Sequence, residues 1–293
     1  MKISELYQQK KTVISLEVFP PKANYSIDTI YQTLDELSDL KPDYISVTYG
    51  AGGKTKDRTV EIASKIKNGY GIEALAHLTC ISFTKDQIRE VMGQFKEHNI
   101  ENVLALRGDI PEDPDFDFPN PLQYKYASDL ISEVKQQDRL CIGAACYPEV
   151  HVDAISPAKD LENLKRKVEL GAEFLISQLF FDNEVFYDFL DKAQQKGITV
   201  PISAGIMPVL NSHQIMRITK LSGCALPAKF TRILNRYQDN PEALKEAGEA
   251  YALEQIIDLM TYGVRGIHLY TMNRADTARR IMASMESIRR LQG

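Results

Sequence analysis

Short apolar runs alternate with amphipathic stretches along the whole chain. Eight runs rich in apolar and β-branched residues have the composition of buried strands, at 13–18, 44–49, 73–79, 102–107, 140–146, 173–180, 200–206 and 266–270. Each is followed by a stretch with helical periodicity, at 27–39, 56–68, 84–98, 126–137, 157–170, 183–196, 211–221 and 274–291. Almost wholly apolar strands are typical of parallel sheets covered on both faces. The alternation therefore predicts an α/β protein with the (β/α)8 TIM-barrel fold.

Two regions depart from this repeat. The segment 110–122 (IPEDPDFDFPNPL) holds four prolines and four acidic residues, and it is either a lid over the barrel mouth or a passive surface loop. Extra helical sequence at 227–237 and 241–260 precedes the eighth strand, where it would support the site or an oligomer contact. No linker divides the chain, so one TIM-barrel catalytic domain is expected over 1–293.

The composition narrows the class of protein. A net charge of -5 without a basic stripe argues against a nucleic-acid surface. No run approaches the ~20 apolar residues that span a membrane. The N-terminus also lacks the layout of a signal peptide, so a cytoplasmic protein is expected. The four cysteines form no Cys-x-x-Cys and no cluster has the spacing of metal ligands, so buried reduced thiols and no metal are expected.

Chemically useful polar residues stand where the apolar runs end. Glu17 stands near the end of the first run, His77 follows the apolar start of the third, Asp109 follows the fourth and Gln178 stands near the end of the sixth. Parallel strands place such ends side by side at one mouth of a barrel, which is where active sites of this architecture lie. The sequence therefore predicts an enzyme and the position of its site.

Nine segments, in order over nearly the whole chain, resemble the methylenetetrahydrofolate reductases. They are SLEVFPP (15–21), SVTYGA (46–51), AHLTC (76–80), LALRGD (104–109), YASDL (126–130), YPEVH (147–151), NLKRK (163–167), QLFFD (178–182) and YTMNRA (270–275). The length is similar to that of the bacterial single-domain form. The resemblance implies a cytoplasmic, oligomeric flavoprotein that uses FAD to pass a hydride from NADH or NADPH to 5,10-methylenetetrahydrofolate. The product, 5-methyltetrahydrofolate, feeds methionine synthesis.

Two carboxylates are the predicted catalytic residues. Opening the methylene bridge requires a proton on N10 of the folate, and Glu17 is the natural donor. Its apolar neighbours are expected to raise its pKa, which suits an acid; the alternative is a solvated carboxylate or a salt bridge. The resemblance places Asp109 against the flavin, where it would tune the potential or stabilise the cationic folate iminium. The alternative for Asp109 is a surface pair with Arg107.

The chain has no Gly-x-Gly-x-x-Gly fingerprint, so side chains and loop amides must hold the dinucleotide. Arg166 and Lys167 are the candidates for the pyrophosphate, although charge alone favours a solvated basic face. Asn163 shares a helix face with Arg166, and Asp160 and His151 would hold sugar hydroxyls or ring nitrogens. The flavin contacts implied by the resemblance are Thr48, His77, Arg107, Gly108, Asp109, Tyr126, Ala127, Ala145, Tyr147, His151, Asp160, Asn163, Arg166 and Lys167.

The folate and nicotinamide contacts are fewer. A neutral amide both donates and accepts, so Gln178 suits the edge of the pterin, and the resemblance assigns it to folate beside Glu17 and Asp109. Gln214 and Arg274 are weaker candidates for folate or nicotinamide. Ile218 stands where bacterial relatives have an aromatic residue that stacks on the ligand, which would alter affinity.

Two other functions fit the same residues. A pterin-binding barrel that transfers a one-carbon unit without flavin would use the same acidic and amide side chains, and it would be colourless. A non-catalytic barrel that binds folate or a partner protein would be stabilised by its ligand and would transfer no hydride.

Overall fold

A computed structural model describes residues 1–21, 25–49, 56–110, 116, 118–136 and 140–291 of the chain. Eight parallel strands pair in chain order, and the last pairs with the first, so that the sheet closes into a barrel. The predicted (β/α)8 fold is confirmed, with a strand inside each predicted run. The strands are β1 (Val13–Val18), β2 (Tyr44–Val47), β3 (Glu73–Thr79), β4 (Asn102–Leu106), β5 (Cys141–Cys146), β6 (Phe174–Ser177), β7 (Ile202–Ile206) and β8 (Gly266–Tyr270).

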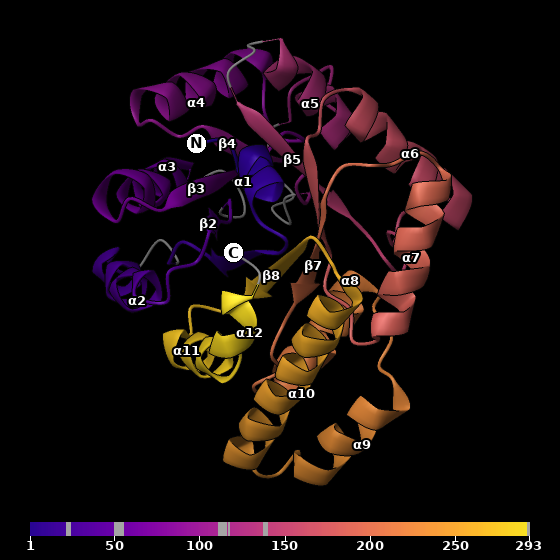
Figure 1. Ribbon diagram of the computed structural model, residues 1–293. Coiled ribbons are helices and arrows are strands. Elements are labelled where there is room, and N and C mark those ends of the chain that lie inside the picture. The colour runs from indigo at the N-terminus through magenta and orange to yellow at the C-terminus, as the bar shows by residue number, and fades with distance from the viewer. Residues whose placement is uncertain (22–24, 50–55, 111–115, 117, 137–139, 292–293) are drawn as a thin grey trace.

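Helices surround the strands (Figure 1). The sequence also marks their ends: Thr84 accepts a hydrogen bond from the Gln87 amide before α4, and Gly197 has a φ of 77 after α7. The helices are α1 (Ile3–Gln9), α2 (Asp28–Ser38), α3 (Lys56–Ser64), α4 (Lys85–Glu97), α5 (Ala127–Lys135), α6 (Pro157–Glu169), α7 (Asn183–Gln195), α8 (Ser212–Ser222), α9 (Ala228–Tyr237), α10 (Pro241–Tyr262), α11 (Ala275–Ser284) and α12 (Glu286–Arg290), with a π-helical turn at Lys65–Gly69.

The N-terminal helix α1 is the element that the hydrophobic pattern misses. Its seven residues are too few for a clear helical period. Ile3 and Tyr7 are buried against the amino ends of the strands, and the Tyr7 ring lies 5.8 Å from the Phe174 ring. The amide of Ile3 donates to the Asn102 side chain at 2.7 Å. Helix α1 therefore closes the end of the barrel opposite the predicted site.

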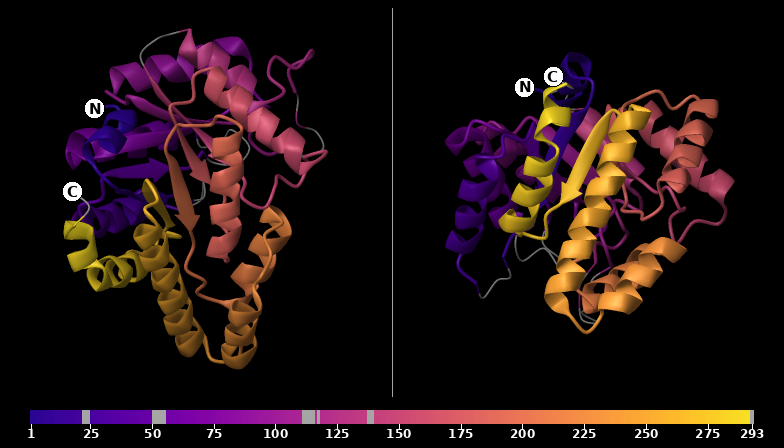
Figure 2. Two further views of the ribbon diagram at one scale, coloured as in Figure 1. Left: turned by 45° about the vertical axis from the view of Figure 1, so that its right-hand side comes forward. Right: turned by 60° about the horizontal axis from the view of Figure 1, so that its bottom comes forward.

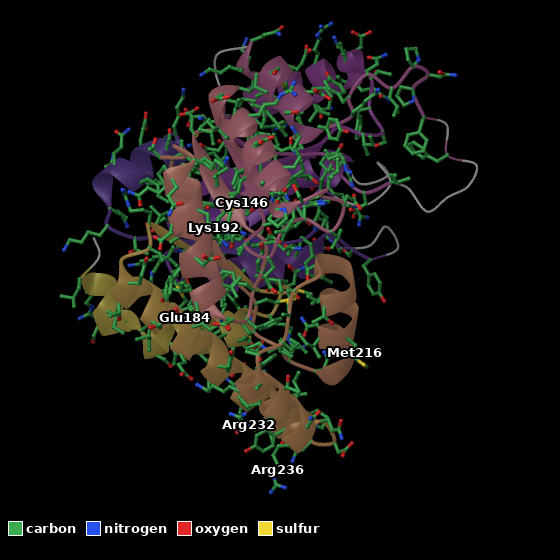
Figure 3. All side chains as sticks on the ribbon, turned by 90° about the vertical axis from the view of Figure 1, so that its right-hand side faces the viewer. Cys146, Glu184, Lys192, Met216, Arg232 and Arg236 are labelled. Atoms are coloured by element: carbon green, nitrogen blue, oxygen red, sulfur yellow. The ribbon has the colours of Figure 1, made fainter. Side chains whose placement is uncertain are left out.

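The extra sequence before β8 is helical, as predicted. Helices α9 and α10 form a hairpin that projects from the barrel (Figure 2), and Arg232 and Arg236 lie near its far end (Figure 3). Phe230 on α9 stacks on Phe181, which follows β6, with the ring centroids 4.9 Å apart. A Cβ atom on Gly248 would lie 1.9 Å from the Val209 carbonyl oxygen, so only glycine permits this approach of α10 to the loop after β7. The hairpin is thus anchored to loops at the carboxyl ends of the strands.

Several other expectations can be compared with the structure. All four cysteines are buried and free. None of the described helices is long and apolar enough to cross a membrane. The described residues contain no cluster of three or more histidine, cysteine or acidic side chains that would hold a metal ion. Of the predicted lid or loop at 110–122, residues 111–115 and 117 lie outside the described residues.

Candidate active site

Glu17 lies inside the barrel mouth between two histidines. Its Oε2 atom is 3.1 Å from Nε2 of His268 on β8 and 3.4 Å from Nε2 of His77 on β3. A serine partners each ring: Ser15 Oγ lies 2.8 Å from Nδ1 of His268, and Ser46 Oγ lies 2.7 Å from Nε2 of His77. The parallel register produces the arrangement, because Ser15 pairs with His268 and Glu17 pairs with Ser46 across neighbouring strands.

This arrangement corrects the expected pKa of Glu17. Burial raises the pKa of the carboxyl and is the largest single influence. The hydrogen bond from His268 and the electrostatic interactions of Glu17 with both rings together outweigh burial, so the net pKa lies below its usual value. The apolar neighbours in sequence are therefore a poor guide, because the groups that decide the pKa come from β3 and β8. Burial lowers the pKa of His77 to about 4, although Glu17 opposes that shift.

His268 is the residue of this cluster that sequence reasoning missed. It is fully buried and touches the predicted acid directly. The period of two along a strand places Ser15 and Glu17 on one face of β1, and closure of the barrel brings β8 beside that face. A search for polar residues inside the eighth apolar run would have found it.

Gly108 and Asp109 follow β4 at the same mouth. Gly108 has a φ of 83, and a Cβ atom there would lie 2.7 Å from Cβ of Thr79. Backbone conformation and close contact with β3 thus both require glycine at this position. Asp109 is exposed. The alternative pairing of Asp109 with Arg107 does not occur, because the Arg107 guanidinium pairs with Asp153 at 3.0 Å.

A groove of about 410 Å³ opens beside the mouth, between the ends of β4 and β5 and the helices α5 and α6. Four implied flavin residues, Thr48, His77, Gly108 and Asp109, do not line it. The other ten do: Arg107, Tyr126, Ala127, Ala145, Tyr147, His151, Asp160, Asn163, Arg166 and Lys167.

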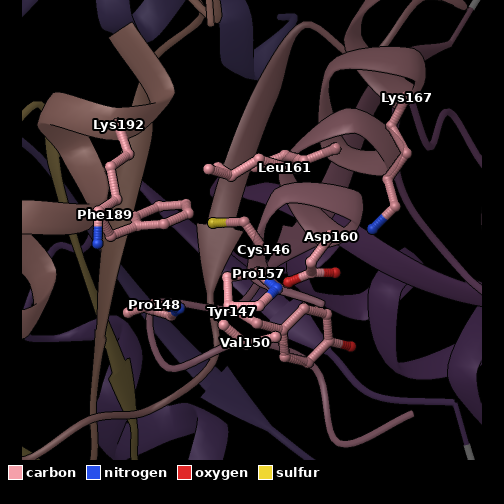
Figure 4. A pocket seen from close by; sticks show the side chains of 11 residues that line it. Cys146, Tyr147, Pro148, Val150, Pro157, Asp160, Leu161, Lys167, Phe189 and Lys192 are labelled. Atoms are coloured by element: carbon pink, nitrogen blue, oxygen red, sulfur yellow. The ribbon is translucent and has the colours of Figure 1, made fainter. Parts of the chain in front are cut away.

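Helix α6 supplies the cationic wall of this groove. Lys167 donates to the Ala145 carbonyl oxygen at 2.9 Å, and its ammonium lies 5.9 Å from the Tyr147 ring centroid. Burial lowers the pKa of Lys167, while nearby Cys146 and Asp160 oppose the shift. Figure 4 shows the Asp160 carboxylate beside both the Lys167 ammonium and the Tyr147 ring. Lys167 is therefore a cation fixed at the groove by its own contacts. Lys165 is half-exposed and pairs with Glu169 at 3.8 Å along the same helix.

The groove also contains residues that the sequence did not indicate. Asp153 and Lys159 line it beside Arg107. Asp153 lies in the loop between β5 and α6, far from Arg107 in sequence, so no local pattern signals their ion pair. The loop is fixed by its own contacts, because the Asp153 amide donates to Nδ1 of His151 at 3.0 Å and the His151 amide donates to Asp160 at 3.2 Å.

The predicted folate and nicotinamide residues are more scattered. Gln178 follows β6 and is half-buried. Gln214 turns its amide oxygen back to accept from the Leu210 amide at 3.2 Å. Arg274 is exposed and lies 3.5 Å from Asp276. Ile218 on α8 is half-buried against the apolar cluster that includes Phe230, while Met216 on the same helix is exposed (Figure 3).

Comparison with known proteins relates this site to a family. The model of the methylenetetrahydrofolate reductase family matches residues 2–286. The chain is 39% identical over 263 residues to the 5,10-methylenetetrahydrofolate reductase of Escherichia coli K12, covering 90% of this chain and 87% of that protein. It is 38% identical over 271 residues to the enzyme of Pectobacterium carotovorum, covering 92% and 88%.

The chain belongs to the methylenetetrahydrofolate reductase family. The predicted resemblance is confirmed by these matches. A more distant relative is a probable methylenetetrahydrofolate reductase (NADH) of Oryza sativa, which is 35% identical over 97% of this chain and 50% of its own length.

Solved structures support the fold of this reductase-family chain. An uncharacterized protein from Clostridium thermocellum, which binds two copies of 5-methyl-5,6,7,8-tetrahydrofolic acid, superposes with a TM-score of 0.71 over 98% of this chain and 100% of its own. The sequence identity is 14%, so the likeness concerns the barrel alone.

Proposed function

We propose that the protein catalyses FAD-dependent reduction of 5,10-methylenetetrahydrofolate to 5-methyltetrahydrofolate with NADH or NADPH as the electron donor. The two substrates would bind in turn over one face of the flavin in a ping-pong sequence. The observation that carries the proposal is the placement of a half-buried carboxylate, Glu17, at the same barrel mouth as an open cationic groove. A flavin-free pterin barrel would have no need of that second groove.

The residues of the groove fit FAD. The Arg166 and Lys167 cations would hold the pyrophosphate, as charged donors do for phosphate oxygens. Asn163 and Asp160 lie along the same wall and would hold sugar hydroxyls. The exposed ring of Tyr126 offers an aromatic face to the groove. Side chains thus supply what a glycine-rich loop supplies in other dinucleotide sites.

Glu17 would give the proton to N10 of the folate. When bound, FAD would accept a hydride from the reduced nicotinamide and supply it to the folate. In the open mouth His268 favours the carboxylate form of Glu17. Folate bound over the mouth would exclude water, which raises the pKa of a carboxyl and favours the acid that the reaction requires.

Asp109 would act on the charge that develops during the reaction, and three further residues would orient the substrates. The exposed carboxylate of Asp109 would face the positive charge that develops as the folate bridge opens, and it would disfavour negative charge on the reduced cofactor. Gln178 would bind the pterin edge, with Gln214 and Arg274 toward the folate or nicotinamide. The rice relative is named as an NADH enzyme, which favours NADH as the donor for this chain.

The test is the visible absorption spectrum of the purified protein, read anaerobically during addition of NADH and then of methylenetetrahydrofolate. The expected result is a flavin spectrum that bleaches with NADH and returns with the folate. A colourless protein that cannot be reconstituted with FAD would overturn the proposal in favour of a flavin-free pterin barrel. A flavin that NADH and NADPH both fail to bleach would overturn the assigned electron donor.

A further inference from the structure

The turn after β8 makes hydrogen bonds to the end of β1, beyond the last residue pair between the two strands. The ladder between these strands ends where Glu17 pairs with Tyr270. Thr271 then donates twice to the Glu17 carbonyl oxygen, from its amide at 3.3 Å and from its hydroxyl at 2.6 Å. The Asn273 side chain accepts from the Phe19 amide at 3.0 Å and donates to the Phe19 carbonyl oxygen at 2.9 Å. The Asn273 carboxamide therefore makes with the Phe19 backbone the two hydrogen bonds that a neighbouring strand would otherwise make.

The backbone of this turn is unusual. Met272 and Asn273 are consecutive non-glycine residues with positive φ, at 53 and 56. Such conformations cost energy and persist where surrounding contacts determine them, often at functional sites. The contacts are present: the Asn273 amide donates to the Thr271 hydroxyl at 3.1 Å, and the Arg274 amide donates to the Thr271 carbonyl oxygen at 2.9 Å. The turn is fixed so that the Asn273 carboxamide faces back toward β1.

The end of β1 depends on this grip because the next residue cannot extend the strand. Pro20 follows Phe19 and has no amide hydrogen to donate. Glu17, two residues before Phe19, must keep Oε2 within 3.1 Å of His268, which is itself fully buried on β8. A shift of the end of β1 against β8 would alter the distance between the carboxylate and that ring directly.

We propose that Asn273 is a positioning residue for Glu17, because its carboxamide fixes the end of β1 against β8 and so holds the carboxylate at the barrel mouth. The inference rests on the proposed role of Glu17 as proton donor. It assigns a function to part of the YTMNRA segment that neither the flavin groove nor the folate contacts explain.

The test is Asn273→Gly in the FAD-loaded protein. Glycine adopts positive φ at no steric cost, so the turn keeps its backbone while the carboxamide is lost. The expected result is a folate half-reaction that is slower by about tenfold to a hundredfold at saturating folate, since a small misplacement of a reacting group costs that much. Flavin reduction by NADH and FAD content should be unchanged. The pH profile of the folate half-reaction should shift, because Glu17 moves relative to His268.

The matched control is Asn99→Gly, which makes the same change at a φ of 58 after α4, away from the barrel mouth. It should leave both half-reactions and the pH profile unchanged. Asn273→Asp serves if the glycine variant does not fold, because aspartate tolerates positive φ and accepts from the Phe19 amide but cannot donate to its carbonyl oxygen. Its folate half-reaction should also be slower than that of the wild type, with flavin reduction by NADH unchanged.

The outcomes separate this inference from the proposed function. Two results in Asn273→Gly would overturn the positioning role: equal slowing of both half-reactions, or a normal folate half-reaction with an unshifted pH profile. The proposed function would stand in either case, provided that Glu17→Gln still impairs the folate half-reaction. A normal folate half-reaction in Glu17→Gln would instead overturn the proposed acid, and the positioning role would fall with it.

Discussion

The interior around Glu17 and the groove along α6 lie at one barrel mouth and are built in opposite ways. In the interior, strands set the positions: register holds Glu17, His77 and His268, while His268 bonds to Glu17 and Ser46 bonds to His77. In the groove, the wall is a face of helix α6. It carries exposed Arg166 and also Lys167, which is bonded to the Ala145 carbonyl oxygen. The difference indicates that the proposed acid is oriented before any ligand binds, whereas the groove supplies charge that a bound dinucleotide would organise.

The largest expected effect concerns the interior. Glu17→Gln keeps the shape of the side chain and removes the proton, so the folate half-reaction should fall by about 10²–10⁴-fold, the usual contribution of a general acid. Flavin reduction by NADH should persist, because the groove is untouched. Stopped-flow measurement of the two half-reactions checks this. Normal folate turnover in the variant would remove the distinction between the two regions.

The interior should also make the protein sensitive to acid. The pKa of His77 is lowered to about 4 when folded, against about 6.5 when unfolded. As pH falls between these values the unfolded chain gains a proton that the folded chain does not, so the free energy of unfolding should decrease by about 3 kcal/mol. The lowered pKa of Glu17 acts in the same direction, since its contribution is lost as pH falls through the folded pKa.

Urea unfolding at pH 7 and pH 4.5 measures this effect. His77→Gln should flatten the change in stability between the two pH values, whereas the matched change His98→Gln, at an exposed histidine after α4, should not. If the free energy of unfolding changes by the same amount between the two pH values in both variants and the wild type, the buried cluster does not control acid stability.

The groove gives the next effect in size. Lys167→Ala removes a cation that lines it, and FAD affinity should fall by about tenfold to a hundredfold, as for other hydrogen bonds to charged groups. Lys165→Ala is the control, because Lys165 does not line the groove. Titration of apoprotein with FAD, followed by flavin fluorescence, reports both values. Equal losses in the two variants would mean that only overall charge matters, and the groove would lose its assignment.

The smallest expected effect concerns Asp109, which lies between the two regions. Asp109→Asn removes a negative charge beside Gly108, so the flavin potential should rise by roughly 30 mV, equal to about 1.4 kcal/mol for two electrons. Redox titration against indicator dyes measures this change. An unchanged potential would exclude a tuning role and leave Asp109 with the developing folate charge alone.

The sequence indicated most of the barrel because its strands are local apolar runs. The runs at 13–18 and 266–270 match β1 and β8 at both ends. Helix α1 was missed because a segment of seven residues is too short to show a clear helical period. Ten of the implied flavin residues line one groove. Asp153 also lines it, but no sequence pattern indicates this residue, because its ion pair with Arg107 depends on how two loops approach in space.

What the sequence determined by itself is the alternation of elements, and with it the mouth at which Glu17, Asp109 and Gln178 stand. A buried strand is specified by its own apolar residues, so that information is local. Only the tertiary structure decided the state of Glu17, because closure of the barrel brings His268 from the last strand to a carboxylate on the first. The pKa of that carboxyl and the grip of Asn273 on Phe19 depend on neighbours about 250 residues away, which no local pattern specifies.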